Sequence, residues 1–374
     1  MRVLLLHNRY RSLGGEERAI RDIAGLLSRR GHTVEVLERA SSEAGRVRAA
    51  RALIGGGVDL EEVGRAVRRL RADIVHAHNV HPLFGWRALA AARAAGARTV
   101  LHLHNFRLFC AIGVAYRDGA VCHRCRGRDM LPGLRLRCRG SVPEAAIYAA
   151  GLYRQQPQLF RHSDRLVALS QQQAGRMAEL GVPAAMMSVL PNFVPGADIA
   201  ARSAAALGRY ALVAGRLVEE KGYDTAIEAA RAAGVPLIVA GAGPDEPRLR
   251  ALAADGEVRF TGLLSASAVA EVRREAAVVL APSRWEEPCP YAVLEAFAAG
   301  VPVLASDRGG LPELVGADAA LHPEDTGAWT AALRELWENP DRREAMGTDG
   351  LRQARERFGE DRYYEELMRI YSPG

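Results

Sequence analysis

A basic pair beside a glycine has the residue types needed to bind phosphate. Arg216 and Lys221 lie five residues apart in segment 215–222, where an apolar run ends and a helical pattern begins. Two cations at the start of a helix can flank a diphosphate, because the helix dipole also favours an anion there. Lys221 is the single lysine among 50 basic residues, and the arginine fork does not reproduce its compact point charge. We interpret the pair as a phosphate clamp; the alternatives are an exposed basic pair and chance survival of one lysine under a codon bias toward arginine.

Two carboxylates in segment 283–295 have the chemistry to bind hydroxyl groups. Glu287 and Glu295 have seven residues between them. If Glu287 lies in a loop and Glu295 in the helix that follows, both carboxylates can face one ligand. An ionised carboxylate accepts hydrogen bonds on two oxygens, so the hydroxyls of a sugar and a ribose are natural partners.

Histidines follow two apolar runs in the first half of the chain. His76 and His78 form one pair and His102 and His104 form another, and a spacing of two places each pair on one face of a strand. In open parallel sheets, ligands bind beyond the carboxyl ends of the strands. A single histidine at a strand end is usually structural, but several at one sheet edge favour a ligand-binding cleft.

Short apolar runs alternate with helical segments in both halves, and these elements must position the residues above. Apolar runs separated by helices predict parallel sheets that are covered on both faces. We therefore predict two doubly wound α/β domains, joined near the proline-rich segment 191–195. The expected strands are 3–7, 33–37, 73–78, 99–104, 165–170 and 187–190 in the first domain, and 210–214, 236–240, 258–261, 278–281, 302–306 and 319–321 in the second.

The composition predicts an ordered protein with an uneven charge. The 374 residues are 49% hydrophobic and 25% charged, and no apolar run approaches the ~20 residues that span a bilayer. The first apolar run lacks a cleavage site after it, so we expect a cytoplasmic protein without a signal peptide. Residues 1–190 hold 30 arginines against 15 acidic residues, whereas residues 191–374 hold 20 basic and 29 acidic ones. The basic half suggests nucleic acid, an anionic membrane or a phosphorylated ligand as a partner, or else a solvated basic surface.

Several motifs follow one another in the order of a known family. The chain resembles glycosyltransferase family 4, whose members are retaining enzymes with the GT-B fold: two Rossmann-like domains that face each other across a cleft. In the second half the motifs are Gly215-Arg216-Leu217 with Lys221-Gly222, Gly241-Ala242-Gly243-Pro244, Pro282-Ser283, Glu287 to Glu295, and Ala299-Gly300-Val301-Pro302-Val303. In the first half they are Gly14-Gly15, Asp73-Ile74-Val75-His76-Ala77-His78, His104 and Pro191-Asn192.

The resemblance implies a role for each matching residue. His104, Arg216, Lys221 and Glu287 would be catalytic: the two cations would hold the diphosphate, and His104 and Glu287 would contact the donor sugar. Glu295 would bind the ribose. The other implied donor-binding residues are Gly14, Gly15, Asn192, Gly215, Gly243, Ser283, Tyr291 and Ala292, and the implied acceptor-side residues are His78, Asn105 and Arg107.

The resemblance also implies a mechanism in which no metal ion is needed, because fixed cations neutralise the leaving group. A retaining reaction can use a carboxylate nucleophile, but the first half offers no obvious one. We therefore adopt front-face attack, in which a donor phosphate oxygen takes the acceptor proton, as a hypothesis.

Three positions depart from the family pattern. Asn105 follows His104 where aspartate is frequent, which puts a charge role there in doubt. Pro290 has no N–H to offer a sugar hydroxyl, so recognition would depend on the amides of Tyr291 and Ala292. Phe193 stands where glycine often follows Pro-Asn.

The expected domain boundaries follow from the motifs and the resemblance. The acceptor-binding domain covers residues 1–191, with an insertion at about 106–142, and the nucleotide-sugar-binding domain covers 192–357. By resemblance, a C-terminal helix within about 358–374 packs back on the first domain.

Four cysteines lie in the insertion. Cys122 and Cys125 have the spacing of a zinc knuckle, with Cys110 and Cys138 on either side. Four thiolates could close a structural zinc site and order a loop that has few apolar residues. Two disulfides, which a reducing cytosol disfavours, and four unrelated thiols remain open alternatives.

The insertion is also rich in arginine. Because it follows the run that ends at His104, we expect it to lie on the acceptor side. An anionic acceptor or an acidic membrane leaflet would suit it, and a lipid-linked saccharide would combine both. The alternative is a structural flap whose arginines face water.

Three other classes compete with a hexosyltransferase that uses a nucleotide sugar. A dinucleotide oxidoreductase needs a three-glycine fingerprint that the first turn lacks. A zinc-containing nucleic-acid-binding protein would leave the acidic half unexplained. Another GT-B enzyme, a glycan phosphorylase or a sugar-phosphate synthase, is the closest alternative. We expect UDP as the donor nucleotide; a glycan, a lipid-linked saccharide or a small molecule as acceptor; and no binding of nucleic acid.

Overall fold

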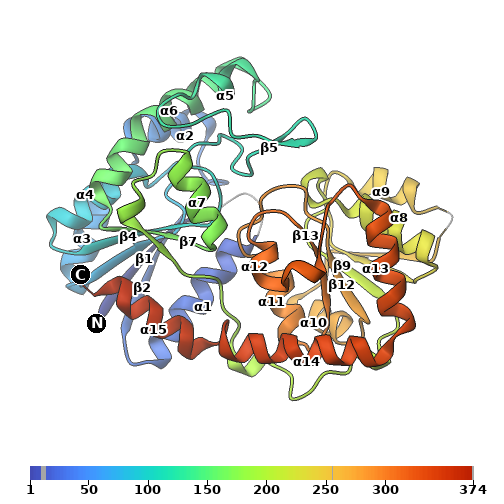
Figure 1. Ribbon diagram of the computed structural model, residues 1–374. Helices are drawn as coiled ribbons and strands as arrows, with labels where there is room; N and C mark the ends of the chain where they lie inside the picture. Colours follow the sequence, from blue (N-terminus) through green and yellow to red (C-terminus); the bar gives the residue numbers. More distant parts are fainter. Residues whose placement is uncertain (10–13, 255, 373–374) are drawn as a thin grey trace. The chain divides into compact units, whose positions relative to one another are not determined.

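The computed structural model describes residues 1–9, 14–254 and 256–372 (Figure 1). The chain divides into two compact units. The first unit comprises Met1–Ala115, Cys122–Leu190 and Tyr364–Gly374, and the second comprises Tyr116–Val121 and Pro191–Tyr363.

The first unit is built on a six-stranded parallel sheet in the order β2-β1-β3-β4-β7-β8. Its central strands are almost completely buried, because helices cover both faces of such a sheet. Val3 to Leu6 of β1, for example, are fully buried. The strands are β1 (Arg2–Arg9), β2 (Thr33–Ala40), β3 (Ile74–Ala77), β4 (Arg98–Leu103), β7 (Arg165–Ala168) and β8 (Met187–Val189).

The helices of the first unit connect these strands. The longest, α6, begins after Ser141, whose side chain accepts a hydrogen bond from the amide of Glu144 and so caps the helix. The helices are α1 (Gly15–Arg29), α2 (Arg46–Gly55), α3 (Leu60–Leu70), α4 (Gly85–Ala94), α5 (Leu131–Arg135), α6 (Val142–His162) and α7 (Gln171–Glu179).

The second unit repeats the scheme with a parallel sheet in the order β11-β10-β9-β12-β13-β14. Trp329 is fully buried in a core with Val213, Val239 and Leu280 from three of these strands. The strands are β9 (Ala211–Ala214), β10 (Leu237–Ala240), β11 (Val258–Gly262), β12 (Val278–Ala281), β13 (Val303–Ser306) and β14 (Ala320–Leu321). The helices are α8 (Tyr223–Ala233), α9 (Glu246–Leu252), α10 (Ala266–Arg274), α11 (Tyr291–Ala298), α12 (Leu311–Val315), α13 (Thr326–Glu338) and α14 (Pro340–Glu356).

The last helix, α15 (Glu360–Tyr371), contributes residues to the first unit. The hydroxyl of Tyr364 lies 2.8 Å from Nε2 of His32, and the hydroxyl of Tyr371 lies 2.8 Å from Nδ1 of His76. Tyr371 is buried. These contacts tie the end of the chain to β3 of the first unit.

The predicted α/β fold is confirmed. All twelve expected strands are present, and their ends lie within three residues of the expected ones. The apolar pattern locates a strand better than it locates the residue at which the strand ends. The insertion also contains a short hairpin, β5 (Tyr116–Arg117) with β6 (Ala120–Val121), and helix α5, which pattern did not predict. Within the described residues, no helix is both long enough and apolar enough to cross a membrane.

Candidate functional site

An ion pair between Lys221 and Glu287 lies at the centre of the predicted donor site in the second unit. Lys221 ends a 3₁₀ turn (Glu219–Lys221), and Glu287 lies in the loop between β12 and α11. Gly222 follows with φ of 64°, and a Cβ there would lie 2.2 Å from the carbonyl oxygen of Pro282. Only glycine allows this close approach, which brings the two loops together.

The carboxylate of Glu287 is held on both oxygens. Oε1 pairs with Lys221, and Oε2 accepts a hydrogen bond from the hydroxyl of Ser283 at 2.5 Å. Ser306 in turn donates to the carbonyl oxygen of Ser283 at 2.5 Å. The side chain of Glu287 is 8% exposed and that of Lys221 is 18% exposed. Lys221, Glu287 and Ser283, all predicted from the sequence, therefore form one connected group.

Arg216 and Gly215 lie beside this group. Gly215 has a positive φ of 151°, and a Cβ there would lie 2.6 Å from the hydroxyl of Tyr223. Burial raises the pKa of Tyr223, the charge of Glu287 raises it further, and Arg216 opposes the shift. Tyr223 thus lies among predicted site residues, although sequence analysis did not select it. Its position directly after Lys221-Gly222 was the available signal.

The glycine turn after β10 packs on the same loop. A Cβ on Gly243 would lie 2.1 Å from the carbonyl oxygen of Leu217. The amide of Leu217 also donates to the carbonyl oxygen of Ala242 at 3.0 Å. Gly243 therefore allows the turn after β10 to pack against the loop that contains Leu217, in addition to any contact with a ligand.

Glu295 lies in α11 and Glu287 in the loop before it, as predicted. Glu295 forms an ion pair with Arg273 of α10, which is 6% exposed. This partner was not predicted. The pair holds the carboxylate in place, since a buried arginine requires a counter-charge.

The remaining predicted donor residues frame the Glu287 loop. Asn192 donates through Nδ2 to the carbonyl oxygen of Cys289 at 2.8 Å, and this hydrogen bond helps to fix the loop. Tyr291 and Ala292 form the first turn of α11, after Pro290. The first amides of a helix have no acceptor within that helix and point toward its N-terminal end, where they suit an anion or a hydroxyl.

Sheet register gathers histidines in the first unit. Leu5 of β1 pairs with His76 of β3, and His76 pairs with Val100 of β4. Because side chains alternate along each strand, His76, His78, His102 and His104 share one face of the sheet.

The rings of these four histidines form a stack. The ring centroids of His76 and His78 lie 4.4 Å apart, and those of His102 and His104 lie 4.5 Å apart. Nδ1 of His78 lies 2.9 Å from Nε2 of His104, so one ring donates to the other. The hydrogen bond from Tyr371 closes the other end of the stack at His76.

Burial keeps the stack uncharged. It lowers the pKa of His76 to about 3, with a contribution from nearby His104. Burial likewise lowers the pKa values of His78, His102 and His104 well below the usual range, and neighbouring histidines add to the shift. The rings are therefore neutral at pH 7 and can act as hydrogen-bond donors or acceptors but not as cations.

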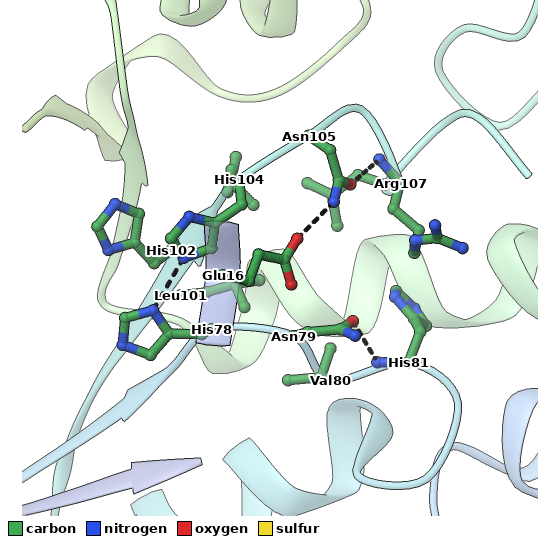
Figure 2. A pocket seen from close by; sticks show the side chains of 12 residues that line it. Glu16, His78, Asn79, Val80, His81, Leu101, His102, His104, Asn105 and Arg107 are labelled. Carbon is green, nitrogen blue, oxygen red and sulfur yellow. Dashed lines mark hydrogen bonds between the residues drawn. The ribbon is translucent and has the colours of Figure 1, made fainter. Parts of the chain in front are cut away.

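The three predicted acceptor-side residues line one pocket (Figure 2). His78, Asn105 and Arg107 lie in it together with the predicted catalytic residue His104. Sequence analysis missed three polar residues of its lining, which are Glu16, Asn79 and His81.

Glu16 and His81 add an acidic side chain and a neutral imidazole to the pocket that contains Arg107. Oε1 of Glu16 accepts a hydrogen bond from Nδ2 of Asn105 at 2.7 Å. Burial lowers the pKa of His81 to about 3, and the charge of Arg107 contributes. His81 is therefore neutral beside a cation. Glu16 follows Gly14-Gly15 in the first helical turn, where an acidic residue is easily assigned to the helix dipole alone.

Gly14 and Gly15 begin α1. The amide of Gly14 donates to Oε2 of Glu17 at 2.8 Å, so in this structure it has an internal acceptor. Burial would raise the pKa of Glu17, but hydrogen bonds from His7 and from the backbone lower it overall. Gly15 is the first residue of the helix, where an amide can still face a ligand.

The four cysteines of the insertion are free thiols in one neighbourhood. Burial raises the pKa of Cys125 to about 11; the amide of Gly133 opposes this, and the other three thiols, Cys110, Cys138 and Cys122, raise it further. In the part of the chain that the structure describes, their sulfur atoms do not form a group of three within 4.8 Å of one another. His76, His78 and His102 are the group there that does.

The predicted site residues are thus distributed over both units. His104 and the acceptor-side residues belong to the first, and Arg216, Lys221, Glu287 and Glu295 belong to the second. Direct contacts join Lys221, Glu287 and Ser283 in the second unit, and His78 and His104 in the first.

The chain matches two models of known protein families. Residues 13–196 match the family model described as Glycosyltransferase Family 4, and residues 202–353 match the model described as Glycosyl transferases group 1. Together the two matches cover both units.

Curated relatives carry glycosyltransferase names. The putative colanic acid biosynthesis glycosyltransferase WcaL of Salmonella typhimurium is 34% identical over 198 residues, which are 48% of this chain and 49% of that protein. The chain matches about half the length of the WcaL proteins. The D-inositol 3-phosphate glycosyltransferase of Gordonia bronchialis is 27% identical over 96% of this chain and 84% of that protein.

Solved structures share the fold over the whole chain. Sucrose-phosphate synthase from Thermosynechococcus elongatus matches with a TM-score of 0.72 and 17% identity, covering 99% of this chain and 98% of that one. HepE of Anabaena, solved in complex with UDP, matches with a TM-score of 0.67 and 18% identity over 99% of each chain. At these identities the likeness concerns the fold alone.

Proposed function

The chain belongs to glycosyltransferase family 4 and has the GT-B fold, and from this premise we propose that it transfers a hexose from a nucleotide diphosphate-sugar to an acceptor hydroxyl with retention of configuration. The observation that carries the proposal is the group formed by Lys221, Glu287 and Ser283, with Arg216 beside it. A leaving nucleoside diphosphate develops negative charge, and fixed cations stabilise that charge without further reorganisation.

In this proposal Lys221 holds the diphosphate and Glu287 holds Lys221. The carboxylate orients the ammonium group, because the two form a mostly buried ion pair. Arg216 is exposed in the structure, so its guanidinium is free to reach the phosphate oxygens. Glu295, which Arg273 orients, then accepts hydrogen bonds from the ribose hydroxyls.

The first unit supplies the acceptor pocket in this proposal. Neutral His104 hydrogen-bonds the donor sugar, while Asn105, Arg107 and Glu16 contact the acceptor. A glycan acceptor in polysaccharide assembly is supported by the names of WcaL and of the amylovoran glycosyltransferase AmsK of Erwinia amylovora, which is 29% identical over 199 residues.

A small phosphorylated acceptor is the second candidate. Arg107 lies in the pocket beside neutral His81, a combination that suits a phosphate. The names D-inositol 3-phosphate glycosyltransferase and alpha-maltose-1-phosphate synthase among the relatives support this alternative.

Retention without a covalent intermediate is also part of the proposal. The acceptor proton passes to a donor phosphate oxygen as the new glycosidic bond forms on the face that the diphosphate leaves. Glu16 is the carboxylate of the acceptor pocket, so it is the side chain to test as a nucleophile. A glycosyl adduct on Glu16, seen by intact mass spectrometry of a trapped reaction, would contradict front-face attack.

A panel of UDP-, GDP- and ADP-sugars tests the donor. A ligand that binds the folded state raises the melting temperature by mass action, so one nucleotide series is expected to stabilise the protein above the others, with UDP-sugars first. The stabilising sugar is then incubated with glycan and sugar-phosphate acceptors, and NMR assigns the anomeric configuration of the product. Absence of stabilisation by every donor, or a product of inverted configuration, would overturn the proposal.

A lipid-linked saccharide would place the basic insertion near an anionic membrane leaflet. Segment 106–141 carries eight arginines and two acidic residues, and such a surface binds anionic lipid with about 1 kcal/mol per basic residue near the membrane. We expect flotation with vesicles that contain phosphatidylglycerol and none with neutral vesicles. Equal behaviour in the two vesicle types would remove this part of the proposal.

A further inference from the structure

The insertion brings together four cysteines that are up to 28 residues apart in the chain. Cys110 follows β4, Cys122 and Cys125 follow the β5–β6 hairpin, and Cys138 follows α5. Gly133 of α5 links two of them: its carbonyl oxygen accepts a hydrogen bond from the amide of Cys138 at 3.0 Å, and a Cβ on it would lie 3.5 Å from Sγ of Cys125. Three separate segments of the chain therefore deliver four thiols to one neighbourhood.

Backbone amides surround one of these thiols. The amides of Ala115, Gly113 and Ile112 all interact with the sulfur of Cys110. Amides that follow a cysteine and donate to its sulfur stabilise a thiolate, because a charged acceptor strengthens the hydrogen bond. Burial outweighs these amides and raises the pKa of the Cys110 thiol. The backbone geometry nevertheless brings the turns of two cysteines together, because the amide of Cys122 donates to the carbonyl oxygen of Ala115 at 2.7 Å.

The charge of the insertion is complementary to such a site. Segment 106–141 holds eight arginines and only Asp118 and Asp129 as acidic residues. A divalent ion bound by four thiolates carries a net charge of about −2. The arginines would balance this negative charge, and this would give them a role beyond contact with solvent.

The same segment has little hydrophobic core. Between Tyr116 and Ala145, a stretch that the structure describes completely, Met130 is the only buried hydrophobic side chain. Its regular structure amounts to the hairpin and the five residues of α5. Segments of this kind are commonly ordered by a metal or by disulfides instead of by apolar packing, and the five cysteines of the chain are free.

We propose that Cys110, Cys122, Cys125 and Cys138 bind one structural zinc ion. The four thiols lose their protons as the ion binds, so Zn²⁺ and four R–SH groups become Zn(SR)₄²⁻ and four released protons, with no change of oxidation state. Zinc prefers four ligands in a tetrahedral arrangement, with sulfur about 2.3 Å from the ion. In the described residues the sulfur atoms lie farther apart than such an arrangement allows, so binding would require the cysteine side chains to rotate toward one another. The site stands apart from the donor chemistry and does not depend on it.

Metal analysis of the full chain, purified without a histidine tag, tests the proposal. We expect about one zinc per chain. The double variant Cys122→Ser/Cys125→Ser should lose the zinc, whereas Cys289→Ser, which removes the cysteine outside the insertion, should keep it. A wild-type protein with only trace zinc, or zinc retained by the double variant, would overturn the proposal.

A second comparison separates the cysteines from the histidine group His76, His78 and His102, whose nitrogen atoms also lie within reach of one ion. The variant His102→Phe should retain its zinc. Zinc lost from His102→Phe but retained in the cysteine variant would assign the metal to the histidines and overturn the proposal.

A measurement on the unaltered chain guards against a variant that fails to fold. Titration with an organomercurial should release zinc, detected with a chromogenic chelator, in step with modification of four thiols. Replacement of zinc by Co²⁺ should give the strong visible bands of tetrahedral thiolate coordination. Under denaturing conditions without reductant, a single reactive thiol would reveal two disulfides, and visible absorption of the purified protein would reveal an iron–sulfur cluster; either would overturn the proposal.

Discussion

The two units prepare polar groups for chemistry in opposite ways. The first buries a stack of neutral histidines inside a parallel sheet, whereas the second places paired charges in loops at the ends of its strands. His76 is fully buried with a pKa of about 3. Lys221 and Glu287 instead form an ion pair in which each supplies the counter-charge of the other. The difference follows from solvation: an interior far from water tolerates polar groups only when they are neutral or paired.

The two arrangements suit different tasks. Paired charges in loops can be rearranged by an anionic ligand, since a diphosphate can replace Glu287 as the partner of Lys221. A neutral imidazole stack cannot bind charge strongly, but it orients hydrogen bonds with little reorganisation. The comparison leads to three predictions, from the largest expected effect to the smallest.

Acid should destabilise the first unit before the second. The pKa values of His76, His78 and His102 lie below the ordinary value of 6.5 in the folded chain, so the unfolded chain binds more protons as the pH falls below about 6.5. Stability is therefore complete above that pH and is lost toward pH 3. Between pH 7.5 and 5.5 each histidine lowers the free energy of unfolding by about 1.4 kcal/mol at most, which is about 4 kcal/mol for the three together.

Hydrogen exchange, corrected for intrinsic rates, measures this effect as the opening free energy of amides in β3 and β4 compared with β9 and β12. The control His322→Gln removes an exposed histidine of the second unit and should leave the difference unchanged. Equal loss of protection in both units on acidification would break the comparison.

Replacement of Lys221 by arginine should lower kcat/KM about a hundredfold, equivalent to about 2.7 kcal/mol. The charge is conserved, but the side chain of Lys221 is only 18% exposed and its ammonium pairs with Glu287. A planar guanidinium cannot take the place of this compact group. Arg250→Lys, an exchange at an exposed position of α9, is the matched control and should leave steady-state kinetics unchanged. Near-normal turnover of Lys221→Arg would mean that the single lysine has no special role.

Removal of the hydrogen bond from His78 to His104 should have the smallest effect. His78→Leu leaves His104 without the group that orients it, and we expect about a tenfold lower kcat, equivalent to about 1.4 kcal/mol. His78→Asn, whose amide can donate from a similar position, should recover most of the rate. If both variants lose activity equally, His78 acts through packing and not by positioning His104.

The candidate site was predictable where a residue carries its own signal. Lys221 is a unique lysine after a strand, and Glu287 and Glu295 bracket the start of a helix. Histidines spaced by two predicted a shared face, which the register of β3 and β4 confirms. Glu16 and His81 were missed because nothing in their local sequence distinguishes a site residue from a helix-cap or turn residue. Tyr223 was missed although it directly follows Lys221-Gly222.

The partners of the site residues were beyond prediction for a related reason. Arg273 looks like any surface arginine of an amphipathic helix, yet it is buried against Glu295. Tyr371 lies 295 residues from His76 and still donates to or accepts from its ring. Such contacts depend on how helices pack on a sheet, and many arrangements satisfy the same apolar pattern.

The amino-acid sequence alone determined the two α/β series, the strand-end positions of the polar residues and the ordered motifs of the family, because alternation of apolar strands and helices is a local property of the chain. The tertiary structure decided which charges pair, which histidines become neutral and which side chains share the acceptor pocket. Those properties depend on burial and on distances of a few ångströms between residues far apart in sequence, and neither composition nor spacing contains them.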